Sequence, residues 1–160
     1  MSVDKYSPHV YVLPEDDANR QLATGFRLGL SNKLRKMKVL EGAGGWQKVL
    51  DCFKEEHVPE MDRNAQRFLV LLMDFDERED RTVKVRAAIP ERLRERVFVL
   101  GIWSEPEKLR PTLGPYETIG GKLAAECRDN TRVSWDDPLL RHNVGELERL
   151  QKHVRPILFG

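Results

Sequence analysis

The sequence predicts an α/β fold: a mostly parallel, four-stranded sheet flanked by helices, with a helical extension at the C-terminus. Three observations lead to this prediction. Short apolar runs alternate with amphipathic or polar stretches along much of the chain. Phe68–Met73 and Val97–Trp103 are apolar throughout, which is typical of central parallel strands covered on both faces. The repeated strand–helix order favours parallel pairing with helices on both sides of the sheet.

The first half of the chain contains the predicted elements in regular alternation. His9–Leu13 is a β-branched and aromatic run, predicted to be a strand. Apolar residues recur every four positions in Asp16–Leu30, which predicts an amphipathic helix. Met37–Leu40 is predicted to be a second strand. After several glycines, Trp46–Phe53 has apolar residues at i, i+3, i+4 and i+7, which predicts a helix. The polar stretch His57–Asn64 is predicted to be a loop.

The second half begins with the two continuously apolar strands, which are separated by Glu79–Ala88, a predicted helix. The Pro/Gly-rich stretch Arg110–Pro115 ends the alternation. Two further helices are predicted near Tyr116–Cys127 and Asn143–Val154. We interpret them as helical additions to the sheet rather than as a second domain.

Length and composition indicate one ordered domain over residues 1–160, with a core at 9–109 and a helical extension at 110–160. Hydrophobic residues make up 40% of the chain and charged residues 33%. The formal net charge of +1 disfavours a polybasic nucleic-acid binder, although it does not exclude a local basic patch. Cys52 and Cys127 form neither a disulfide framework nor a zinc pattern. We expect two small buried side chains in a reducing compartment.

The apolar segments also bear on location. The first ten residues contain no apolar core of a signal peptide. The longest apolar runs are far too short to cross a bilayer. We therefore expect a cytoplasmic protein without membrane association, whose oligomeric state is unknown.

Carboxylates directly follow three of the four predicted strands. Glu15 follows the first strand, Asp74 and Asp76 follow the third, and Glu105 follows the fourth. The C-terminal ends of parallel strands share one edge of a sheet, and ligands bind there. Carboxylates this close repel each other unless a cation lies between them. Oxygen ligands without His or Cys favour Mg²⁺ or Mn²⁺, so we predict such a metal site at Glu15, Asp74, Asp76 and Glu105.

Most of these acids also have an explanation that involves no ion. Acidic residues in the first turn of a helix interact favourably with the helix dipole, which would account for Glu15, Asp16 and Asp17. Asp76 and Glu79 have the spacing of an N-terminal capping box. Asp74 has no comparable explanation, because it ends a very apolar strand.

The acidic pattern resembles that of Toprim (topoisomerase–primase) domains. Their glutamate after the first strand is matched by Glu15, and their Asp-x-Asp after the third strand is matched by Asp74 and Asp76. The segment EGAGGWQK at 41–48 is similar to the Gly-rich second turn of many Toprim-like proteins. One position departs from the pattern, since Asp16 stands where these domains usually have glycine.

The resemblance covers roughly residues 9–109 and implies a Toprim- or Rossmann-like sheet. Glu105 resembles an extra acid of small stand-alone bacterial Toprim-like proteins, which are grouped with OLD-type nucleases and other nucleases of phage defence. The resemblance implies metal-dependent phosphoryl transfer on nucleic acid, with Asp74 and Asp76 holding one or two Mg²⁺ ions. Glu15 would complete the ligand set or act as general acid or base. Hydrolysis of DNA or RNA is the simplest such activity for a single domain, and a protein partner encoded alongside is possible.

Two other functional classes remain open. A non-catalytic Toprim-like module would bind nucleic acid or a partner without cleaving it, and a metal-binding assay distinguishes it from a nuclease. A receiver-like signalling domain would use Asp16, Asp17, Asp74 and Ser104. Receivers, however, need a fifth strand led by a Lys-Pro pair, and the sequence contains none.

Nucleic-acid binding also requires basic side chains near the site. Lys33, Arg35, Lys36 and Lys38 form a run without acids, and we expect them to contact phosphates. They precede the second strand, however, which favours the opposite edge of the sheet. The basic residues of 78–86 are interleaved with acids and are expected to form a solvated surface. The four histidines share no spacing, and no catalytic role is expected for them.

Overall fold

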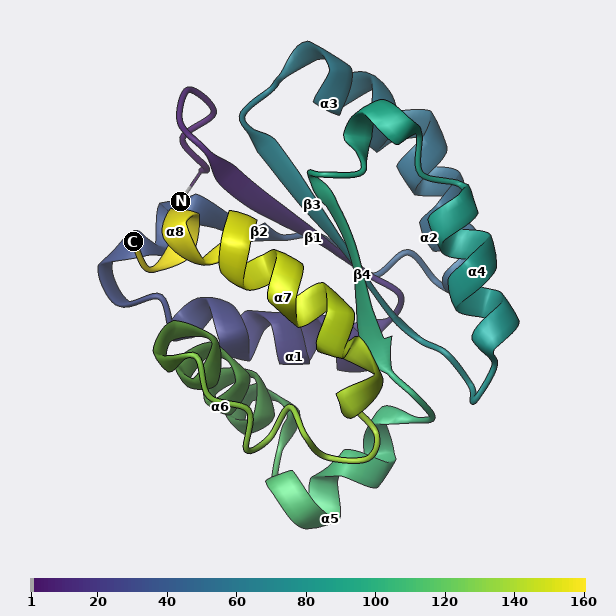
Figure 1. The fold of residues 1–160 in the computed structure, drawn as a ribbon, viewed down its shortest axis with the longest axis vertical. Coiled ribbons are helices and arrows are strands. Elements are labelled where there is room, and N and C mark those ends of the chain that lie inside the picture. Colours follow the sequence, from purple (N-terminus) through teal and green to yellow (C-terminus); the bar gives the residue numbers. More distant parts are fainter. Residues whose placement is uncertain (1) are drawn as a thin grey trace.

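A four-stranded parallel sheet forms the centre of the computed structural model, which describes residues 2–160 (Figure 1). The strands are β1 (His9–Pro14), β2 (Met37–Val39), β3 (Arg67–Asp74) and β4 (Val97–Ile102). Their order across the sheet is β2-β1-β3-β4, and all neighbours are parallel. The predicted α/β fold is therefore confirmed. The strand order reverses between β1 and β3, so this fold has its topological switch point there.

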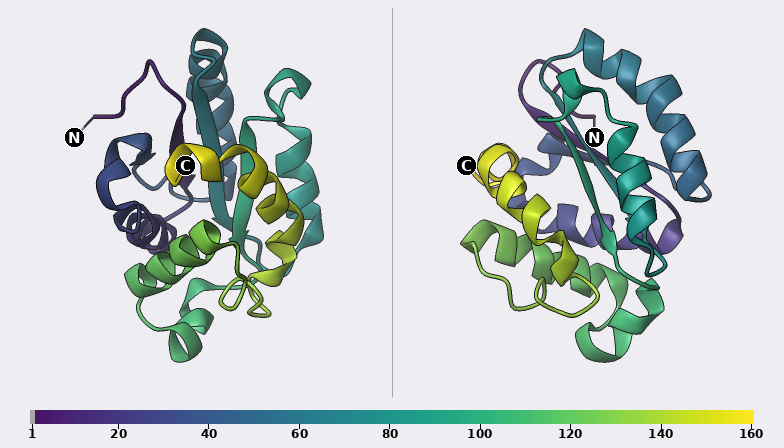
Figure 2. Two further views of the ribbon diagram at one scale, coloured as in Figure 1. Left: turned by 60° about the vertical axis from the view of Figure 1, so that its left-hand side comes forward. Right: turned by 45° about the vertical axis from the view of Figure 1, so that its right-hand side comes forward.

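Helices cover both faces of the sheet, as the side views in Figure 2 show. One face carries α2 (Trp46–Cys52), α3 (Val58–Arg63) and α4 (Glu79–Ala87). The other carries α1 (Asp17–Leu28), α6 (Tyr116–Asp129), α7 (Val144–His153) and α8 (Arg155–Leu158), and α5 (Arg110–Leu113) precedes α6. The shorter segments are η1 (Ser31–Lys36), η2 (Phe53–His57), η3 (Glu91–Leu93), η4 (Pro106–Leu109) and η5 (Arg141–Asn143). None of the helices in residues 2–160 has the length and apolar character needed to span a membrane.

Side chains alternate between the two helical layers along each strand. In β1, Val10 and Val12 pack toward α1, while Tyr11 and Leu13 pack toward α2. In β3, Leu69 and Leu71 are fully buried on the α2 side. Burial on both faces explains why β3 and β4 are apolar throughout instead of alternating with polar residues.

The prediction of a loop at His57–Asn64 is wrong, because α2, η2 and α3 form one continuous helix from Trp46 to Arg63. Phe53 and Met61 of this helix are completely buried against the sheet. Their burial stabilises helical structure that the polar composition of the stretch does not indicate. Pro59, which has no N–H to donate, is the second residue of α3 and lies within this continuous helix.

The C-terminal helices belong to the layer that contains α1. Helix α6 crosses α1 so closely that a Cβ added to Gly25 would lie 2.1 Å from the Glu117 carbonyl oxygen. Helix α7 lies along the outer edge of β4, where the Val99 N–H donates to the Glu146 carboxylate at 2.7 Å. In residues 2–160 no fifth strand pairs with β4. Side chains of the α7 region cover the edge in its place, unlike the arrangement of a receiver domain.

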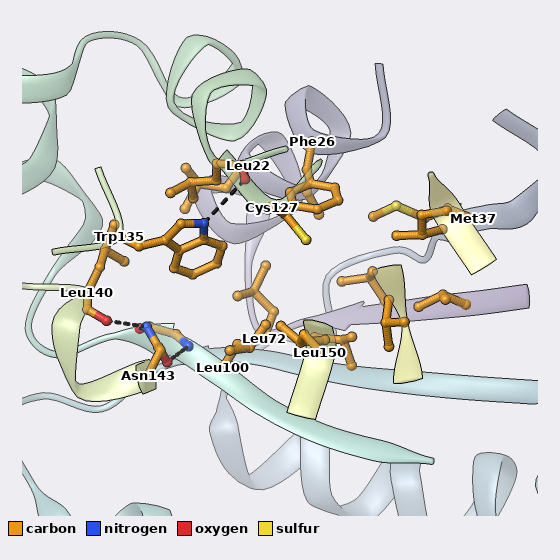
Figure 3. A pocket seen from close by; sticks show the side chains of 18 of the residues that line it. Leu22, Phe26, Met37, Leu72, Leu100, Cys127, Trp135, Leu140, Asn143 and Leu150 are labelled. Carbon is orange, nitrogen blue, oxygen red and sulfur yellow. Dashed lines mark hydrogen bonds between the residues drawn. The ribbon is translucent and has the colours of Figure 1, made fainter. Parts of the chain in front are cut away.

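An apolar cavity of about 90 Å³ lies between the sheet and the α1 layer (Figure 3). Phe26, Met37, Leu72 and Cys127 form part of its wall. Trp135 also lines it and is buried, with its indole N–H donating to the Leu123 carbonyl oxygen at 3.2 Å. Trp135 is thus a core residue, although its neighbours in the sequence are mostly polar.

Candidate functional site

Three carboxylates meet where β1 and β3 end. Glu15 follows β1, Asp16 is the N-cap of α1, and Asp74 is the last residue of β3. One oxygen atom from each carboxylate lies within 4.8 Å of the other two. The cluster thus occupies the C-terminal edge of the sheet at the switch point between β1 and β3, the place where open α/β sheets bind ligands.

Backbone contacts and the helix cap hold these side chains in place. A Glu15 carboxylate oxygen accepts the Asp74 N–H at 2.9 Å, which ties the end of β1 to the end of β3. The Asp16 Oδ1 atom accepts both the backbone N–H and the side-chain amide of Asn19, each at 3.0 Å. The same Asn19 amide nitrogen lies 3.3 Å from the Asp74 Oδ1 atom. The N-terminus of α1 therefore joins all three acids into one cluster.

Burial and mutual repulsion disfavour the charged forms of Glu15 and Asp74 in this cluster. Asp74 is 8% exposed, and its burial, followed by the charges of Glu15 and Asp16, raises the pKa of its carboxyl group to about 8. Burial is also the main cause that raises the pKa of Glu15. Within residues 2–160, no Lys or Arg side chain forms an ion pair with any of the three carboxylates. Such an arrangement is expected to attract a cation.

Asn19 presents its amide nitrogen to the carboxylates and has an unsatisfied amide oxygen. The residue is fully buried, and its Oδ1 atom has no hydrogen-bond partner in residues 2–160. An unpaired buried acceptor costs about 1–3 kcal/mol. Carboxylate and amide oxygens without sulfur or imidazole are the donor set that Mg²⁺ or Mn²⁺ prefers, so the residues present fit such an ion. Asn19 is not among the site residues predicted from the sequence, although its position three residues after Asp16 is a usable signal.

The structure places Asp76 outside this cluster. Its carboxylate forms an ion pair with Arg81 at 2.9 Å, and its side chain is 53% exposed. Asp76 and Glu77 have left-handed backbone conformations, with φ of 50° and 60°, so the chain turns sharply after the buried Phe75. The N-cap of α4 is Arg78, and the capping-box explanation for Asp76 is therefore wrong.

Arg81 supports the end of β3. It is 7% exposed, and one of its nitrogens donates to the Asp74 carbonyl oxygen at 2.8 Å while also contacting Asp76. The guanidinium lies over the Trp46 ring, 4.9 Å from its centroid. The expectation of a solvated basic surface over residues 78–86 is therefore wrong for Arg81. The interleaving of acids and bases in this stretch does not show that Arg81 is buried.

The remaining predicted site residues lie apart from the cluster. Glu105 is an exposed residue at the start of η4 and does not join the three carboxylates. The basic run consists of Lys33, Arg35, Lys36 and Lys38. Its first three members lie in η1, before β2, and the fourth lies within β2. This run is therefore at the N-terminal edge of the sheet, opposite the carboxylates.

The glycine-rich turn after β2 positions Glu15. Gly44 and Gly45 have φ of 95° and 136°, a region of backbone conformation that favours glycine. Their N–H groups donate to the Glu15 carbonyl oxygen at 2.8 and 3.3 Å, and the Ala43 N–H donates to Pro14 at 3.0 Å. These donors hold the end of β1 and are not free for a phosphate group. Lys48, one turn into α2, lies beside Gly44.

Comparison with known proteins does not assign this chain to a family. No family model, no curated protein and no solved structure matches it. The carboxylate cluster at the switch point is therefore the basis for assigning a function.

Proposed function

We propose that the protein binds Mg²⁺ or Mn²⁺ at Glu15, Asp16 and Asp74 and hydrolyses phosphodiester bonds in DNA or RNA. One observation carries this proposal: the three carboxylates converge at the switch point, and no basic side chain in residues 2–160 pairs with them. A divalent cation would remove the repulsion that their convergence creates. The metal type follows from the all-oxygen donor set.

The residues have distinct roles in this proposal. Asp74, fixed at the end of a buried strand, and Asp16, fixed as a helix cap, hold the ion, and the Asn19 amide nitrogen, which donates to both acids, keeps them in position. The Glu15 oxygen that does not accept the Asp74 N–H is available as a ligand or as a proton acceptor. When bound, the ion supplies positive charge that stabilises the oxygens of the phosphate group. Arg81 positions the end of β3.

Two lysines that follow strands β2 and β4 are the proposed contacts for the phosphate groups of the substrate. Lys48 lies in the first turns of α2, after the glycine-rich turn, and Lys108 lies in η4, after β4. Neither side chain forms an ion pair within residues 2–160, so both are available for phosphate groups. These lysines replace the basic run at the opposite edge as the proposed phosphate contacts. A role in phage defence remains an expectation from the Toprim resemblance, and a cytoplasmic location remains an expectation from the short apolar runs of the sequence.

Thermal and chemical unfolding with chelator or with Mn²⁺ tests the metal site. The parent protein should gain about 2.7 kcal/mol of unfolding free energy when Mn²⁺ is at about 100 times its Kd, because the ion binds only the folded state. Asp74→Asn and Asp16→Asn should gain little. Asp17→Asn is the matched control, because Asp17 is an exposed acid next to the cluster, and it should respond like the parent.

Cleavage of labelled single-stranded DNA, double-stranded DNA and RNA tests the activity. We expect cleavage that needs Mg²⁺ or Mn²⁺ and falls sharply in Asp74→Asn. If Mn²⁺ stabilises neither the parent nor the control, the metal site is wrong. If the ion binds but none of the substrates is cleaved, a non-catalytic binding module is the better description.

A further inference from the structure

Residues 2–160 contain a second group of metal-binding side chains, and its chemistry differs from that of the carboxylate cluster. The Sγ atom of Cys52, a carboxylate oxygen of Glu56 and a ring nitrogen of His57 lie within 4.8 Å of one another. All three belong to the continuous helix from Trp46 to Arg63. The donor set is one sulfur, one nitrogen and one oxygen, which is a combination that Zn²⁺ prefers and Mg²⁺ does not.

The π-helical segment η2 is what brings the three side chains together. In a regular α-helix with 3.6 residues per turn, residue i+4 shares a face with residue i, whereas residue i+5 points about 140° away. In η2 the Val58 N–H donates to the Phe53 carbonyl oxygen, five residues earlier, so the turn contains one more residue. Glu56 and His57, one helical turn towards the C-terminus, then both lie near the Cys52 side chain. Such segments are rare and occur frequently at functional sites.

His57 supplies the nitrogen atom of this group from a largely buried position. The residue is 7% exposed, and one of its ring nitrogens lies within 4.8 Å of the Cys52 sulfur and of a Glu56 carboxylate oxygen. Neutral imidazole is a common ligand of Zn²⁺. The Cys52 thiol donates to the Glu56 carboxylate at 3.3 Å.

We propose that Cys52, Glu56 and His57 bind Zn²⁺ through Sγ, one carboxylate oxygen and one ring nitrogen. With metal–ligand bonds of about 2.0–2.3 Å, the ligand atoms of a tetrahedral zinc site lie about 3.5 Å apart, so small side-chain rotations complete the geometry. The Cys52 proton leaves to solvent as the Zn–S bond forms, and no redox change is involved. Glu56 is exposed and Cys52 partly exposed, so the fourth position is open to water or a further ligand. This site does not depend on the function proposed for the carboxylates.

Co²⁺ is a suitable probe, because a thiolate bound to it gives a sulfur-to-metal charge-transfer band that oxygen ligands do not give. Reduced parent protein should bind one Co²⁺ with this band, and added Zn²⁺ should abolish the band by displacement. Cys52→Ser should show no band. Glu56→Gln and His57→Asn should bind at least about tenfold more weakly. Cys127→Ala, which removes the other cysteine, and Asp74→Asn, which removes a carboxylate of the first cluster, should keep the band unchanged.

A second measurement follows the Cys52 thiol directly. Zn²⁺ should slow alkylation of Cys52 by iodoacetamide in the parent and in Asp74→Asn, so the result separates this site from the carboxylate cluster. The proposal is overturned if the parent shows no band at millimolar Co²⁺, or if Cys52→Ser keeps the band and Cys127→Ala loses it. Should His57→Asn not fold, Glu56→Gln decides the matter, since Glu56 is exposed and its replacement leaves the packing intact.

Discussion

Two buried carboxylates of this protein have opposite surroundings. Glu146 on α7 is 2% exposed, accepts the Val99 N–H at 2.7 Å and forms ion pairs with Arg149 at 2.7 Å and Arg86 at 3.7 Å. Asp74 at the end of β3 is 8% exposed, yet its carboxylate lies against two other carboxylates and forms no ion pair with a basic side chain in residues 2–160. Both acids are buried, but only Glu146 has its charge compensated by the protein.

The difference separates a structural acid from a functional one. A buried carboxylate stabilises a fold when hydrogen bonds and opposite charges replace the water it has lost. Glu146 meets this condition and closes the edge of β4. Asp74 does not meet it, and the protein therefore keeps a destabilising group at the place where ligands bind in this kind of sheet. The following predictions test this contrast.

The largest effect is expected from Glu146→Ala. This change leaves the Val99 N–H without its acceptor and two arginines without their anion, and it should lower the free energy of unfolding by about 3–5 kcal/mol in urea denaturation. Glu148→Ala is the control, because Glu148 is exposed on the same helix, and its effect should stay within about 0.5 kcal/mol. If Glu146→Ala and Glu148→Ala lowered the free energy of unfolding by similar amounts, Glu146 would not be a structural acid.

The opposite sign is expected from Asp74→Asn in metal-free protein. The pKa of Asp74 rises from 3.8 to about 8 on folding, so the folded state holds the proton more tightly and loses stability as pH increases between these values. The variant should have a flatter pH profile and exceed the parent by about 1–3 kcal/mol at pH 8 and above. Denaturation in chelator from pH 5 to 9 measures this. A variant that is less stable than the parent at pH 8 would identify Asp74 as a structural acid.

The two faces of the sheet offer a smaller comparison. The face toward α1 has a cavity of about 90 Å³, and the Cys127 side chain lines it (Figure 3). Cys127→Met places more apolar volume there and should raise the free energy of unfolding by about 1 kcal/mol. Met61→Leu on the opposite face, where Met61 is completely buried, serves as the control and should give no gain. A lower melting temperature for Cys127→Met would show that the cavity cannot accept the larger side chain.

The smallest effect is expected from Asp76→Asn. Asp76 is half exposed and pairs only with Arg81, which also bonds to the Asp74 carbonyl oxygen, so its loss should cost at most about 1 kcal/mol. The stabilisation by Mn²⁺ should stay as in the parent. Differential scanning calorimetry with and without Mn²⁺ measures both quantities. Loss of the Mn²⁺ effect in this variant would make Asp76 a metal ligand, as the Toprim resemblance predicts.

Part of the site could be predicted because strand ends are visible in the sequence. Glu15 and Asp74 each follow a strong apolar run, and parallel pairing of β1 with β3 brings such positions to one edge. Asp76 was assigned to the same group because it is only two residues further on. The sequence does not show that Asp76 and Glu77 adopt left-handed conformations that turn the side chain toward Arg81.

Other features depend on contacts between distant segments. Asn19 joins the cluster through α1, and Asn143 bonds to both the N–H and the carbonyl of Gly101 instead of capping α7. The π-helical segment at Phe53–His57 likewise has no local signature in a polar stretch. It forms because Phe53 and Met61 must both reach the sheet from one helix.

The sequence by itself determined the parallel sheet, the helices on both faces and the edge at which the acids gather, because apolar periodicity directly reflects burial on one face or two. Only the tertiary structure decided which acids lie together without a basic partner in residues 2–160 and which are neutralised by arginines. The physical reason is range. Periodicity is a local property of the chain, whereas the compensation of a buried charge depends on side chains that folding brings from far along the sequence.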